Sequence, residues 1–115
     1  MTTPINVGDV ANAVVAAASG VLKKDVTAIE GFSTDQVRRI ERLSITLATM
    51  IAAGEFADDP ESEQDHLGIL KDLIVNFGKT LKGLAVVTTE KVINAVVKTV
   101  WDTVSKAAGV ALPVP

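Results

Sequence analysis

Apolar side chains recur every three or four positions along most of this chain, which is the spacing of one face of an α-helix. The pattern is clearest in the second half, where two such stripes follow one another after a short break. The first stripe is Leu67, Leu70, Ile74, Phe77, Leu81 and Leu84, and the second is Ile93, Val97, Val100, Val104, Ala108 and Ala111. Two consecutive amphipathic helices, each with one face to bury, are therefore predicted.

Two further stripes occupy the first half of the chain. They are Val7, Val10, Val14, Ala17, Ala18 and Val21, followed by Val37, Ile40, Leu43, Leu47 and Ile51. Four polar residues, Arg38, Arg39, Glu41 and Arg42, fall outside the second of these stripes, and we expect them in solvent. The first half therefore predicts two more amphipathic helices.

Capping and stop residues set the helix boundaries. Ser33 followed by Gln36 predicts a capping box, and Asp59 followed by Pro60 predicts a cap with proline in the first turn. Gly109 is placed to end the last helix. The expected helices span about 4–24, 33–54, 60–83 and 88–109, followed by an extended tail at 110–115. Short links favour antiparallel neighbours, so we expect residues 1–115 to form a single helical domain, a compact all-α bundle.

One alternative to the last helix stays open. Valine is a mediocre helix former, so a strand near 84–88 or 96–100 is the other interpretation. The polar residues of this region share one helical face, which favours the helix; they are Lys91, Asn94, Lys98, Asp102 and Ser105.

Composition is that of an ordinary globular domain. Of 115 residues, 48% are apolar and 22% are charged, which argues against disorder. Most apolar residues are alanine or valine, so the helices must approach closely. The chain has no cysteine, and this excludes disulfides and thiolate metal sites.

The formal net charge of −3 is unevenly distributed. Residues 55–65 hold six acids and no base, whereas residues 66–115 hold six lysines and three acids. The acidic block is expected to be a solvated turn, and a patch for cations or a basic partner is the alternative.

Candidate chemistry is sparse. The sequence Gly78-Lys79-Thr80 resembles the end of a phosphate-binding loop, but the glycine required five residues earlier is Leu73, and the triplet lies within a helical stripe. Glu63 and His66 form one Glu-x-x-His pair, whereas di-metal bundles need two. We therefore predict no catalytic, cofactor-binding or metal-binding residue, and no enzyme.

Nucleic-acid binding is also not expected. The sequence pI is near 5.0, and the cluster of Arg38, Arg39 and Arg42 is interrupted by Asp35 and Glu41.

Several apolar residues lie outside the stripes or at their edges and are candidates for contact with other proteins: Val15, Leu22, Ile45, Ile69, Val75, Trp101, Leu112 and Val114. They favour a non-enzymatic structural or interaction protein. Such a protein would self-associate or form part of a larger assembly, and the small size and the absence of cysteine and catalytic groups suit a phage or bacterial accessory component.

Two other functions remain as alternatives. A membrane-active helical protein that inserts one of two helices is one. The helix at 4–24 is rich in alanine and valine and has a broad apolar face, and the helix at 88–109 combines a valine stripe with Lys91, Lys98 and Lys106. A small regulatory binding protein is the other. Membrane contact is not favoured, and the longest uncharged stretch before the C-terminus, at 10–22, has 13 residues against the roughly 20 of a spanning helix. We expect a soluble protein of the cytoplasm or of a virion.

Overall fold

The chain folds into four α-helices, as the hydrophobic spacing predicts. The computed structural model describes the backbone of residues 7–114, with side chains from Val10 onward. The helices are α1 (Val7–Leu22), α2 (Thr34–Ala52), α3 (Pro60–Thr80) and α4 (Val86–Ala108), and a 3-10 turn, η1 (Val26–Ala28), follows α1. No strand is present in residues 7–114, so the all-α prediction is confirmed and the strand alternative near 84–88 or 96–100 is wrong.

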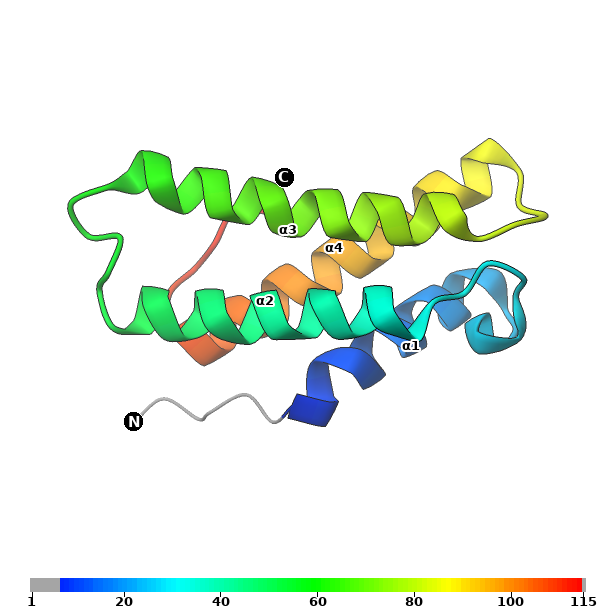
Figure 1. Ribbon diagram of the computed structural model, residues 1–115, viewed down its shortest axis with the longest axis horizontal. Coiled ribbons are helices and arrows are strands. Elements are labelled where there is room, and N and C mark those ends of the chain that lie inside the picture. The colour runs from blue at the N-terminus through cyan, green and yellow to red at the C-terminus, as the bar shows by residue number, and fades with distance from the viewer. Residues whose placement is uncertain (1–6, 115) are drawn as a thin grey trace.

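The four helices form two layers (Figure 1). In Figure 1, α2 and α3 lie side by side in front, and α1 and α4 cross behind them. Successive helices run in opposite directions, and α1 packs most extensively against α4. The helices α2 and α4 approach closely across the diagonal, whereas no Cα atoms of α1 and α3, in their described residues, lie within 8 Å of each other. The bundle is therefore flattened, and it measures 44 × 26 × 21 Å.

One continuous core lies between the layers. Its α1 and α4 sides are built mainly from alanine and valine, and its α2 and α3 sides from leucine, isoleucine and phenylalanine. Phe77 is fully buried, and Phe32 packs edge-on against it with ring centroids 6.0 Å apart. The small side chains on α1 and α4 let these two helices approach closely, which explains why their contact is the most extensive.

The boundaries of α1 and α2 differ slightly from the predicted ones. The predicted helix at 4–24 ends at Leu22, because Lys23 takes a left-handed φ of 56°; its predicted positions 4–6 lie outside the described residues. Ser33 caps α2 as predicted and accepts a hydrogen bond from the Gln36 backbone N–H at 3.2 Å. The Gln36 side chain instead accepts a hydrogen bond from Thr80 of α3 at 2.9 Å.

The boundaries of α3 and α4 show the larger error. Asp59 caps α3 as predicted, but the helix ends at Thr80 and not at residue 83. Leu81 and Leu84, the last two members of the predicted stripe, belong to the link, which turns at Gly83 with a φ of 76°. α4 begins at Val86, two residues earlier than predicted, and its N-cap position makes no side-chain hydrogen bond.

The C-terminal end of α4 is confirmed with one change in the stripe. Gly109 follows the helix with a left-handed φ of 74°, as expected of a stop glycine. Ala111, the last residue of the predicted stripe, is exposed beyond the helix end. Val92, Val96 and Trp101 join the buried face instead.

Candidate interaction surfaces

The eight predicted contact residues do not form one patch. Ile69 on α3 and Val114 in the tail are exposed, with 54% and 52% of their surface accessible. Five others are half-buried: Val15, Leu22, Ile45, Val75 and Leu112. Three of these five, Val15, Leu22 and Leu112, pack against the core. Trp101 is only 3% exposed.

Three exposed valines were missed by the sequence analysis. Val86 and Val87 begin α4 and are 74% and 62% exposed, and Val110 follows the end of α4. The sequence placed Val86 and Val87 in a link, where exposure carries little meaning. In the structure they are neighbours in the first turn of a helix, so they form a small exposed apolar patch at that end of the bundle.

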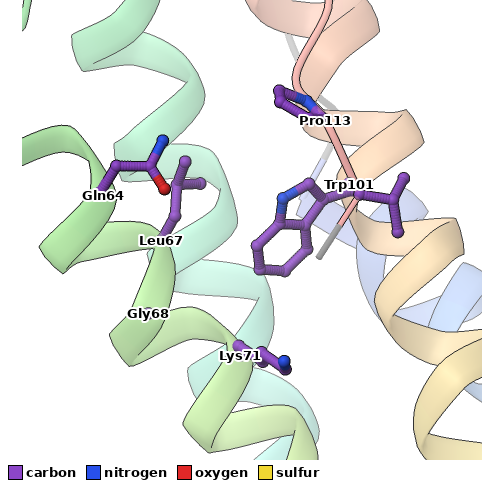
Figure 2. Close-up of a pocket in the computed structure, with 7 residues that line it drawn as sticks. Gln64, Leu67, Gly68, Lys71, Trp101 and Pro113 are labelled. Atoms are coloured by element: carbon purple, nitrogen blue, oxygen red, sulfur yellow. The ribbon is translucent and has the colours of Figure 1, made fainter. Parts of the chain in front are cut away.

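The C-terminal tail folds back beside the gap between α3 and α4. Ser105 accepts a hydrogen bond from the Leu112 backbone N–H at 3.1 Å, which anchors the tail. A hollow of about 260 Å³ lies here, lined by Gln64, Leu67, Gly68, Lys71, Trp101, Pro113 and Val114. Figure 2 shows the indole of Trp101 reaching toward the turn of α3 that carries Leu67 and Lys71, with Pro113 beside it. The tail thus covers part of the edge of Trp101.

The outer face of the bundle is formed by the exposed sides of α2 and α3, which face the viewer in Figure 1. At one end of this face, α2 exposes Arg38, Arg39 and Arg42. The other end carries the acidic residues of the α2–α3 link and of the first turns of α3: Glu55, Asp58, Asp59, Glu61 and Asp65, all exposed. The face therefore has a basic half and an acidic half.

Glu41 corrects the expectation for α2. It was expected in solvent but is only 6% exposed, because it lies on the side of α2 that faces α1. Its carboxylate accepts a hydrogen bond from the Ala11 backbone N–H at 3.1 Å. Ser44, one turn later, is also buried and donates to the Ile40 carbonyl at 2.6 Å. With Glu41 turned inward, no acid separates the exposed arginines of α2 from one another.

The described residues do not gather into a reactive or metal-binding cluster. No group of three or more histidine, aspartate or glutamate side chains is placed to hold a metal ion in the part of the chain that the structure describes. His66 donates from Nδ1 to the Ser62 carbonyl at 2.7 Å, and its ring lies 5.2 Å from that of Phe56. Both contacts are typical of a histidine with a structural role.

Comparison of the chain with protein-family models, curated proteins and solved structures finds no match. Among the helices of the described region, none combines the length and the apolar character that crossing a bilayer requires.

Proposed function

We propose that this chain is a structural or interaction protein that works by binding protein surfaces, its own copies first. The observation that carries the proposal is the set of large apolar side chains left in solvent by a bundle whose core is filled: Ile69, Val86, Val87, Val110 and Val114. No buried polar side-chain atom of the described residues lacks a hydrogen-bond partner. The interior that these residues form therefore offers no unpaired polar side chain to which a ligand would bind.

The exposed apolar residues matter because of their arrangement. A single exposed apolar side chain is ordinary on a protein surface. Val86 and Val87, however, are adjacent and more than half exposed. Full burial of a valine side chain contributes roughly 1.5–3 kcal/mol, so covering this pair would favour association.

The membrane alternative receives less support. It requires the apolar face of α1 or of α4. Both faces are buried in the core: Val10 and Val14 of α1 and Val92, Val96 and Val100 of α4 are no more than 1% exposed. Insertion into a lipid surface would therefore require the bundle to open first. Flotation with anionic vesicles should leave the protein in the unbound fraction.

Light scattering coupled to size exclusion tests the proposal. The measured mass should rise above that of one chain as the concentration increases through the micromolar range. The variant V86S/V87S should fold with the same helical content and associate less. A mass that stays at one chain throughout this range would contradict the proposal.

A further inference from the structure

The outer face is charged in opposite senses at its two ends. Its basic half exposes four positive side chains and two acids: Arg38, Arg39, Arg42, Lys79, Asp35 and Asp72. Its acidic half exposes five carboxylates, and the sequence has no lysine or arginine between positions 43 and 70. Thr46, Thr49 and the exposed Ile69 lie between the halves, and the exposed Lys71 follows Ile69 on α3.

Four charged positions, two on each helix, are evenly placed about the middle of this face. Because Gln36 of α2 is bonded to Thr80 of the antiparallel α3, ten residues along each helix bring Thr46 level with Leu70, the chain neighbour of Ile69. The middle of the outer face therefore lies at Thr46 and Ile69.

Residues at equal distances from this middle, on α2 toward one end and on α3 toward the other, carry opposite charges. Arg42 and Arg38 lie four and eight residues before Thr46, which is about 6 and 12 Å toward one end. Asp65 and Glu61 lie four and eight residues before Ile69, about the same distances toward the other end.

We propose that a second copy of this chain docks on the outer face through a two-fold axis that passes near Thr46 and Ile69 at right angles to the helices. Such an axis lays α2 of each copy over α2 of the other, and α3 over α3, and it reverses the long direction of the face. It therefore brings Arg42 and Arg38 of each copy to the levels of Asp65 and Glu61 of the other, one helix across, so that the basic half of each copy faces the acidic half of the other. The interface is isologous and closes as a dimer. This inference rests on the proposed self-association and adds to the exposed apolar side chains of α4 a second surface, for which the partner is another copy of the chain.

Charge complementarity favours a second copy over other occupants. A nucleic acid or an anionic membrane would be attracted to the arginines but repelled by the acidic half of the same face. A second copy satisfies both halves at once, and Ile69 lies close to its symmetry mate at the centre. Because exposed ion pairs are individually weak and are screened by salt, the dimer should dissociate as the salt concentration increases.

Charge reversal in each half tests the arrangement by sedimentation velocity. R38E/R42E and E61K/D65K should each lower the dimer association constant roughly 10- to 100-fold, because the symmetry places every changed charge in the dimer twice. Glu61 lies in the first turn of α3, where a positive charge opposes the helix dipole. E61Q/D65N is therefore the second variant for this half, and circular dichroism verifies the fold of each.

Mixing the two reversed variants provides the decisive comparison. In a mixed dimer the changed positions of each copy again lie level with opposite charges on the other, so an equimolar mixture should dimerise more strongly than either variant alone. The matched control K91E/K98E changes two exposed lysines of α4 and should leave the association constant unchanged. Association that is insensitive to both reversals, or a mixture no stronger than its components, overturns this inference while leaving self-association in place. A chain that never associates overturns both.

Discussion

Replacement of Gly31 by alanine is the sharpest test of how the helices are joined. Gly31 lies in the link between α1 and α2 with a φ of 93°, a conformation that residues with a side chain rarely adopt. A Cβ atom built here overlaps the Thr80 carbonyl at the end of α3. Beside it, the Lys82 backbone N–H donates to the Glu30 carbonyl at 2.8 Å, so the two links are held together through their backbones.

The expected cost follows from three contributions. The left-handed backbone costs alanine about 1–2 kcal/mol, and loss of the Lys82–Glu30 hydrogen bond costs about 1 kcal/mol. The overlap adds to this, because a backbone carbonyl cannot rotate away as a side chain can. The reduced freedom of the unfolded chain returns about 0.4–1 kcal/mol. We therefore expect Gly31→Ala to lower the free energy of unfolding by about 2–4 kcal/mol, which for a domain of this size lowers Tm by on the order of 10 °C.

Thermal unfolding followed by circular dichroism measures this change. Gly68→Ala is the matched control, because Gly68 lies inside α3 and a Cβ there meets no atom within 4 Å. That control should gain about 0.5–1 kcal/mol from helix propensity. If Gly31→Ala unfolds at the same temperature as the natural chain while Gly68→Ala is stabilised, the close joint between the two links is wrong.

Three further predictions concern the core, the α2–α3 link and η1. Val97→Asp should abolish the cooperative helical signal in circular dichroism, because Val97 is 3% exposed and the carboxylate would have no partner; a folded variant would contradict the described core. His66→Ala should cost about 1–2 kcal/mol in chemical unfolding, since it removes the Ser62 hydrogen bond and the Phe56 contact; an unchanged midpoint would count against both contacts. Hydrogen bonds from the Thr27 side chain, and next from its backbone N–H, hold the pKa of Asp25 below its ordinary 3.8. The stabilisation is therefore present above pH 3.8 and is lost as the pH falls through the lowered pKa, and Thr27→Val should move the Asp25 carboxyl titration observed by NMR to higher pH.

Helix identity could be predicted from this sequence because local chemistry and periodicity agree. Ser33 and Asp59 cap their helices as expected, and Gly109 ends the last one. The end of α3 could not be predicted in this way. Leu81 and Leu84 continue the spacing of the stripe although the chain has already left the helix, because apolar residues of a link can also point into the core. Periodicity alone cannot separate these two cases.

The surface was less accessible to prediction, because burial depends on partners that are distant in sequence. Glu41 looks like a solvated residue of a basic cluster until α1 supplies the Ala11 N–H that binds it. The polarity of the outer face depends on this burial and on the antiparallel pairing of α2 with α3. Both are tertiary features, so the sequence shows an arginine cluster and an acidic block but not that they share one face.

Concentration-dependent amide chemical shifts offer the most direct test of the central claim, that copies of this bundle associate through the outer face of α2 and α3. As the protein is concentrated at low salt, shifts should change at residues 38–49 and 61–72 and return when salt is added. The amides of α1 and of the second half of α4 should remain constant. Changes confined to α1 and α4, or spectra that do not depend on concentration at all, would contradict the claim.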